Sequence, residues 1–179
     1  MRVLQLLVLV GLLALPTAAS WAQDENPVIL AMTNGAGLPG EIVEVELLVH
    51  RAEEIKGDAT RLSGLDLLLS WDPAIAALVS LSTTEVTAGW QLAQRAEAGS
   101  VEVSMASLDP VSATPVGLRV LAFRFELQPT QGESPLDLSE TRAFDLDQVP
   151  IVHVVEPGTL TSSAVPVETM GMGRWKAGH

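Results

Sequence analysis

The sequence of 179 residues contains no cysteine and no tyrosine, and aromatic residues make up only 4% of it. The absence of cysteine excludes disulfide bonds, thiolate metal ligands and a cysteine nucleophile. The fold must therefore be held by ordinary burial of apolar side chains, and the length suffices for one domain with a proper core. The scarcity of aromatic residues argues against strong polysaccharide binding, because a flat sugar-binding surface needs several exposed rings.

Basic residues are also scarce. The sequence has ten lysines and arginines against 22 aspartates and glutamates, so its formal net charge is −12. A surface this acidic repels nucleic acids and anionic membranes. It suits a neutral polymer, a basic partner or a partner that carries calcium. We therefore expect no nucleic-acid partner and no membrane association of the mature protein.

The longest apolar stretch is too short to span a membrane. This stretch, Val3–Leu15, follows a single positive residue at Arg2 and falls short of the ~20 residues that a span needs. Together with the small residues Ser20 and Ala22, the pattern is typical of a secretory signal peptide. We expect cleavage after Ala22, which removes residues 1–22 and takes the formal net charge from −12 to −13 because Arg2 is lost. The mature protein is then secreted, in an extracellular or periplasmic location.

Most of the remaining sequence consists of short apolar runs separated by turn residues. Glu41–Val49 and Gly99–Ser107 alternate polar and aliphatic residues, as strands with one solvated face do. Val116–Leu127 has the more apolar pattern of a buried strand. Weaker candidate strands are Val28–Met32, Leu78–Ser82, Trp90–Ala96, Leu136–Ser139, Ile151–Val155 and Gly158–Thr161. About nine short strands with regular turns predict an all-β sandwich or jelly roll.

Helical periodicity is not sustained anywhere in the sequence. The nearest approach is Pro73–Val79, where Asp72 would cap one helical turn that begins with proline. Neither a repeat nor a linker interrupts Val28–Ser162. We expect one domain at residues 23–162, followed by a disordered tail at 163–179, which has no strand pattern.

The segment Ser63–Trp71 predicts which side chains of one strand face the core. Successive side chains of a strand point to opposite faces. We therefore expect an inward set of Leu65, Leu67, Leu69 and Trp71, and an outward set of Gly64, Asp66, Leu68 and Ser70. An outward leucine beside an outward aspartate forms a small mixed patch of the kind that a protein partner uses. A strand face that only meets solvent is the alternative.

Few residues could support catalysis or bind a metal ion. The three histidines are far apart in sequence, and neither a Gly-x-Ser-x-Gly nor a His-Glu-x-x-His motif is present. Asp145 and Asp147, with Glu140 nearby, could hold calcium, but they lack the glycine and the further carboxylates of a dedicated calcium loop. We predict a protein that is not an enzyme and has no cofactor or metal site. A secreted hydrolase would need a cleft with converging histidines or carboxylates.

A series of short motifs follows in a set order along the chain. They are Leu38-Pro-Gly-Glu-Ile-Val-Glu-Val45, Ser63-Gly-Leu-Asp-Leu-Leu-Leu-Ser-Trp-Asp-Pro73, Leu78–Leu81, Gly89-Trp90, Val101–Ala106, Leu118–Phe125 and Val155–Leu160. In this order and spacing the motifs resemble those of a cohesin domain, over about Pro27 to Ser162. The resemblance implies a nine-stranded jelly-roll β-sandwich, related in fold to certain carbohydrate-binding modules.

The resemblance also implies a non-catalytic function. Cohesins bind a dockerin, a small protein module that carries calcium, and so tie enzymes to a scaffold in extracellular polysaccharide-degrading assemblies. The dockerin lies on an open sheet face that includes the strand before Asp72-Pro73 and the strand that ends at Ala106. A carbohydrate-binding module of the same fold, with a polysaccharide as partner, is the alternative.

The positions that match this dockerin contact supply the candidate partner-binding residues. They are Gly64, Asp66, Leu68, Ser70, Ser104 and Ser107. Asp66 stands at the acidic contact position of the family. Gly64 stands where an asparagine is frequent, and Ser104 and Ser107 fall where leucine and glutamate are frequent. A cohesin-like protein with a different ligand is therefore also open at this point.

Overall fold

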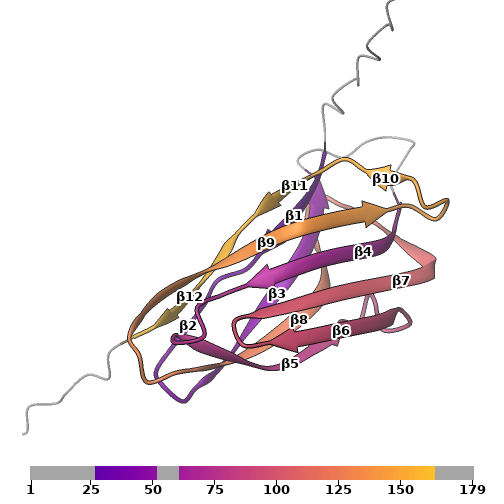
Figure 1. The fold of residues 1–179 in the computed structure, drawn as a ribbon. Helices are drawn as coiled ribbons and strands as arrows, with labels where there is room; N and C mark the ends of the chain where they lie inside the picture. The colour runs from indigo at the N-terminus through magenta and orange to yellow at the C-terminus, as the bar shows by residue number, and fades with distance from the viewer. Residues whose placement is uncertain (1–26, 52–60, 164–179) are drawn as a thin grey trace, which may run out of the picture.

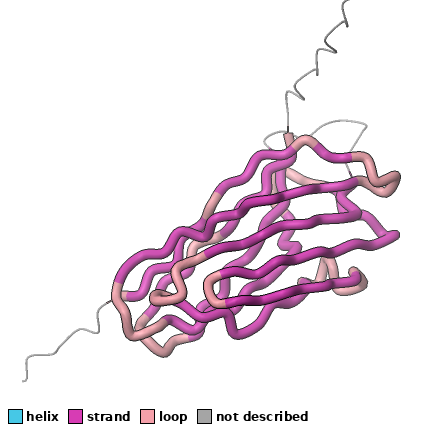
Figure 2. The backbone as a smooth tube through the Cα atoms, viewed as in Figure 1, coloured by secondary structure: helices cyan, strands magenta, loops and turns pink. Residues whose placement is uncertain are grey.

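Strands make up most of the chain that the structure, a computed structural model, describes: residues 27–51 and 61–163 (Figures 1 and 2). The expected signal peptide at 1–22, and residues 164–179 of the expected tail, lie outside these ranges. Within them, no helix has the length and apolar character needed to cross a membrane. The described strands are β1 (Val28–Met32), β2 (Gly35–Gly37), β3 (Ile42–Arg51), β4 (Arg61–Ser70), β5 (Ala76–Thr83), β6 (Gln91–Glu97), β7 (Ser100–Ser112), β8 (Leu118–Leu127), β9 (Gly132–Phe144), β10 (Pro150–Ile151), β11 (His153–Glu156) and β12 (Gly158–Ser162).

These strands form two sheets that pack against each other. One sheet has five strands in the order β11-β1-β3-β8-β5. The other has seven: the path β2-β12-β9-β4-β7-β6, and β10, which pairs with β9. In Figure 1, strands β9, β4, β7 and β6 lie side by side in the layer nearer the viewer, with β3 and β8 behind them. The predicted all-β sandwich is confirmed.

The described chain contains more strands than the nine that the sequence predicts, and the extra ones are short. β2 has three residues, Gly35–Gly37, of which two are glycine, so no alternating pattern marks it. The predicted strand Ile151–Val155 is divided at Val152, because β10 pairs with β9 in one sheet and β11 pairs with β1 in the other. The chain crosses between the two layers at that residue.

The core lies between the sheets, and β4 contributes to it as the alternation predicts. Leu65 and Leu69 have no exposed surface, and Leu67 and Trp71 are also buried. Burial of one such leucine contributes about 1.5–3 kcal/mol. The Trp71 ring meets Phe125 of the opposite sheet edge to face, with ring centroids 5.1 Å apart and planes at 74°. Its Nε1 donates a hydrogen bond of 2.9 Å to the carbonyl oxygen of Ala76, so this tryptophan is a core residue.

The segment after Trp71 forms one turn and then a strand. Asp72 Oδ1 accepts a hydrogen bond of 2.8 Å from the backbone N–H of Ala74, which is the predicted cap. The Ile75 and Ala76 N–H groups then both donate to the Asp72 carbonyl, at 3.0 and 3.2 Å. The expected helical turn does not reach Val79, because β5 begins at Ala76 and pairs with β8.

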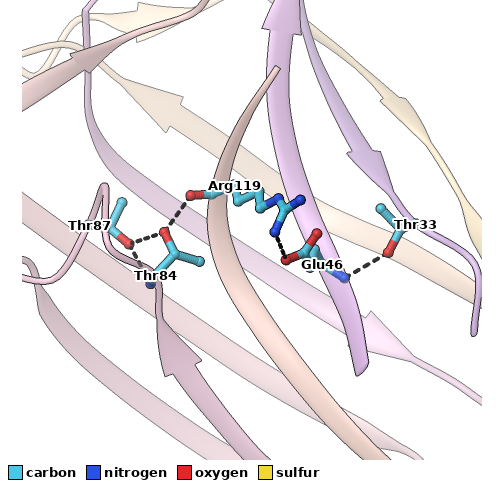
Figure 3. A network of polar contacts seen from close by, with 5 residues as sticks. All are labelled: Thr33, Glu46, Thr84, Thr87 and Arg119. Carbon is cyan, nitrogen blue, oxygen red and sulfur yellow. Dashed lines mark hydrogen bonds and ion pairs between the residues drawn. The ribbon is translucent and has the colours of Figure 1, made fainter. Parts of the chain in front are cut away.

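A buried threonine ties the β5–β6 loop to β8 (Figure 3). Thr87 has no exposed surface, and its hydroxyl donates a hydrogen bond of 2.7 Å to the Val120 carbonyl. The same oxygen accepts a bond of 3.1 Å from the Thr84 N–H. The Thr84 hydroxyl in turn donates to the Arg119 carbonyl. The loop is therefore held by side-chain hydrogen bonds rather than by a strand ladder.

The outer side of the five-stranded sheet uses some of its polar groups within the chain. The Arg119 guanidinium pairs with the Glu46 carboxylate at 3.1 Å, and the Glu46 N–H donates to the Thr33 hydroxyl at 2.8 Å (Figure 3). Arg119 is 68% exposed, so this ion pair contributes little, about 0–1 kcal/mol. Its main effect is to join β3 and β8 on that side.

Thr87→Val is expected to lower the free energy of unfolding by about 1–3 kcal/mol, because the isosteric valine leaves a buried carbonyl and a backbone N–H without their partner. Chemical denaturation followed by circular dichroism measures the change. Thr83→Val is the matched control, since the Thr83 side chain makes no hydrogen bond among the described residues, and it is expected to shift stability by less than about 0.5 kcal/mol. Equal stabilities of the two variants would contradict the role given to Thr87.

Candidate functional site

Four neighbouring strands of the seven-stranded sheet, β9, β4, β7 and β6, present one continuous surface on the side away from the core (Figure 1). The alternate positions of β4 that do not enter the core define it. We call this surface the outer face. Its cross-strand rows are Phe144–Gly64–Ala106–Gln91, Arg142–Asp66–Ser104–Ala93, Ser139–Leu68–Glu102–Arg95 and Asp137–Ser70–Ser100–Glu97.

The candidate residues Asp66 and Ser104 lie opposite each other in the second of these rows. The Ser104 hydroxyl donates a hydrogen bond of 2.6 Å to Asp66 Oδ1. Asp66 is half-buried and Ser104 is exposed, so the pair is open to solvent. A charge-assisted bond of this length fixes the carboxylate, and it occupies one acceptor that a partner would otherwise use. Leu68 and Ser70, also half-buried, follow in the next two rows as predicted.

Gly64 differs from its expected exposure. It belongs to the outer face by its place in the strand, but it is buried. A Cβ atom added to Gly64 would lie 3.5 Å from both Cβ and Cδ2 of Phe144. These are ordinary van der Waals distances, so the Phe144 side chain of β9 lies against β4 at Gly64 and contributes to the burial of the glycine. Phe144 is a member of the outer face that the sequence does not predict, because the predicted strand ended at Ser139.

The candidate residue Ser107 lies in a large bulge of β7. Gly64 pairs with Ala106 and Leu62 pairs with Val111, so the single residue Ser63 of β4 stands opposite the four residues Ser107–Pro110. The Asp109 N–H donates to the Ser107 hydroxyl at 2.9 Å and fixes the bulge. The bulge leaves the Leu108 side chain 91% exposed. Sequence alternation ends at Ser107, and Pro110 is the one local sign of a break in the strand.

A second bulge lies in β9, beside Asp66. Asp66 pairs with Arg142 and Leu68 pairs with Ser139, so Leu67 faces two residues, Glu140 and Thr141. Glu140 has a φ of 50°, in the left-handed region that is unusual for a residue with a side chain. It is exposed on the outer face. Neither Glu140 nor Arg142 is among the predicted partner-binding residues, and the sequence suggests Glu140 only as a possible calcium ligand.

The groups that suggested catalysis or metal binding serve local structure. Asp145 Oδ1 accepts hydrogen bonds from the N–H groups of Asp147 and Val149, at 3.0 and 2.8 Å, and thereby closes the turn after β9. His153 Nδ1 lies 2.9 Å from the Ile151 carbonyl, and its Nε2 lies 2.8 Å from the Thr141 hydroxyl. Within residues 27–51 and 61–163, no three histidine or acidic side chains are grouped to hold a metal ion.

The aromatic residues of the described chain lie mostly in the core. Trp71 and Trp90 are each only 7% exposed, and Phe123 and Phe125 have no exposed surface. Phe144 alone among the described aromatic residues is partly exposed. The outer face is therefore a mixed polar and aliphatic surface rather than a row of aromatic rings.

Comparison with solved structures finds cohesin domains. A non-cellulosomal cohesin from the hyperthermophilic archaeon Archaeoglobus fulgidus matches with a TM-score of 0.65 and 14% identity, over 77% of this chain and 92% of that one. The sixth cohesin of scaffoldin B from Acetivibrio cellulolyticus, solved with a dockerin, has a TM-score of 0.63 and 14% identity, over 76% and 99% of the two chains. A type I cohesin–dockerin complex from Clostridium thermocellum gives a TM-score of 0.62 and 12% identity, over 78% and 95%.

The sequence itself matches no family model and no curated protein. The likeness is therefore one of fold, at 12–16% identity in the structures compared. Within that limit the resemblance inferred from the order of the motifs is confirmed: the chain has a cohesin-like fold.

Proposed function

We propose that this protein is a non-catalytic binding module that docks a dockerin-like protein on its outer face. The observation that carries the proposal is the geometry of that face. Four strands wide, it is mixed in polarity, and it places Asp66 and Ser104 side by side at its centre. Solved structures of the same fold include complexes with dockerins, which supports a partner of that kind.

The shape of the surface favours binding over catalysis. The outer face is built on paired strands, so its residues lose little conformational freedom when a partner binds. Its acidic and basic groups are spread along successive rows of the sheet. Leu68, half-buried in the third row, supplies apolar area between Glu102 and Ser139. Such a mixed patch is typical of a surface that contacts another protein.

Docking takes place outside the cytoplasm. The leader at residues 1–22 sends the chain out of the cytoplasm, and the domain at 23–162 acts there as a secreted module. The calcium belongs to the partner, because the calcium-binding loop of a dockerin has no counterpart in this sequence. Gly64, Ser70 and Ser107 remain part of the proposed contact, with Gly64 acting through the Phe144 side chain above it.

Leu68→Arg is expected to weaken partner binding at least about tenfold, because a long charged side chain replaces an apolar contact on the outer face. The full mature chain is immobilised and used to capture proteins secreted by the producing cell, with calcium or with a chelator. We expect calcium-dependent capture of a protein with a duplicated aspartate-rich calcium loop. The affinity of that module for each variant is then measured by calorimetry.

Leu48→Arg is the matched control for Leu68→Arg. Leu48 is also half-buried, but it lies on β3 in the other sheet. The control is expected to bind the module as the unchanged chain does. Retention of the chain on insoluble polysaccharide, with no protein captured, would contradict the proposal and favour the carbohydrate-binding alternative.

A further inference from the structure

One end of the outer face carries a groove whose lining is apolar over the larger part of its area, with serine, glutamine and aspartate side chains between the apolar ones. Gly64 and Ala106, which pair between β4 and β7, are among its lining residues. Leu108 of the β7 bulge stands on one side, and Phe144 and Leu146 stand on the other. The groove has a volume of about 890 Å³. Leu108 is 91% exposed and Leu146 is 48% exposed, so both present apolar surface to solvent.

Local hydrogen bonds hold both walls of the groove in place. The Asp109 N–H donates to the Ser107 hydroxyl, and proline follows at the next position, so the bulge around Leu108 has little freedom. On the other side, the turn that carries Leu146 is closed by hydrogen bonds from two backbone N–H groups to Asp145 Oδ1. A leucine held at nearly full exposure gains no burial from its own chain, and only a bound partner would remove it from water.

The charges around this groove have one sign. Asp66, Asp109 and Asp145 line it, and its lining contains neither lysine nor arginine. The neighbouring groove over the middle of the outer face differs, since both Arg95 and Arg142 are among its lining residues. The apolar groove is therefore the part of the outer face where a positively charged partner gains most from charge complementarity.

We infer that the partner's main anchor is a large apolar side chain, flanked by lysine or arginine, that enters the groove between Leu108 and Phe144. This inference rests on the proposed function and names the chemistry of the partner's contact segment. The Asp66 carboxylate contributes less to partner binding, because its Oδ1 already accepts a hydrogen bond from the Ser104 hydroxyl. A second copy of this chain is a poor occupant, since two chains with a formal net charge of −12 repel each other.

The first test uses a synthetic helical peptide in which a leucine lies between two lysines on one face. One matched peptide has serine in place of the leucine, and another has glutamates in place of the lysines. In isotope-labelled mature protein, we expect the first peptide to shift the amide signals of Gly64, Ala106 and Leu108. Both matched peptides should bind at least about tenfold more weakly. Equal binding by all three, or shifts confined to other residues, would overturn the inference.

The second test compares variants of the full chain. Leu108→Ser is expected to weaken binding of the peptide, and of the captured calcium-binding module, about tenfold or more, as loss of a central apolar contact does. Asp109→Lys should also weaken binding of the peptide and of the module. Val116→Ser is the matched control, because Val116 is 94% exposed and lies outside the outer face. Asp66→Asn should have a smaller effect than Leu108→Ser.

The outcomes separate this inference from the proposed function. If the module binds in a calcium-dependent way, and its affinity is unchanged by both Leu108→Ser and Asp109→Lys, the inference is wrong while docking on the outer face stands. If no module is captured but the leucine–lysine peptide binds at Leu108, the proposed function fails and the preference of the groove stands. Self-association of the chain that Leu108→Ser abolishes would make a second copy the occupant and would also overturn the inference.

Discussion

Gly158→Ala is expected to lower the free energy of unfolding by about 3 kcal/mol, the upper end of the range for overpacked sites. An alanine Cβ at this position would lie 2.4 Å from the Thr33 carbonyl oxygen and 2.9 Å from Met32 Cβ. Both atoms belong to the chain as it leaves β1, while Gly158 itself is paired with Leu136 of β9. Neither side can move without loss of strand pairing, so the added methyl group forces the two sheets apart at this point.

Denaturation of the variant by urea, followed by circular dichroism, measures this loss. Gly89→Ala is the matched control, because an added Cβ at Gly89 has no atom within 4 Å. The control is expected to change stability by less than about 0.5 kcal/mol. A Gly158→Ala variant that unfolds at the same urea concentration as the control would show that β12 can shift away from β1.

Leu69→Ala is expected to cost about 2–5 kcal/mol, whereas Leu68→Ala at the next residue is expected to cost less than about 1 kcal/mol. Leu69 has no exposed surface and leaves a cavity between the sheets when it is shortened. Leu68 is half-buried on the outer face, where water replaces the lost atoms. The pair tests the orientation of β4 directly, since a shift of one residue would exchange the two values.

The two leucine variants also separate folding from binding. Leu68→Ala should weaken capture of the partner while its unfolding transition stays near that of the unchanged chain. Leu69→Ala should unfold more easily than the unchanged chain. Under conditions in which it is folded, it should capture the partner as the unchanged chain does. Similar unfolding transitions for both variants would contradict the division of β4 into an inward and an outward set.

The orientation of β4 follows from the sequence because it depends only on neighbouring residues. The alternation from Leu65 to Trp71 is unbroken, and all four inward positions are buried in the structure. The turn at Asp72 is equally local, since its cap joins residues two positions apart. Features of this kind require no knowledge of which strands pair.

The two bulges do not follow from the sequence, because they depend on registers between distant strands. The bulge at Ser107–Pro110 exists only because Leu62 and Gly64 pair with residues five positions apart on β7. The bulge at Glu140 interrupts the alternation of β9, and the predicted strand therefore ended at Ser139 although β9 continues to Phe144. Arg142 and Phe144 of the outer face lie beyond the predicted strand for this reason.

The parallel pairing of β1 with β11, and of β2 with β12, has a consequence for folding kinetics. One edge of β1 pairs with β3, but its other edge pairs only with β11 near the end of the domain, as Val28 and His153 show, and β2 pairs with the last strand, β12. Contacts between such distant residues form slowly, because a long loop must close first, and sheet proteins of this kind typically fold in milliseconds to seconds. Until β11 and β12 arrive, the edges of β1 and β9 that they cover are unpaired and can join another chain. The vulnerable period of this protein is therefore the interval before β11 and β12 reach their places.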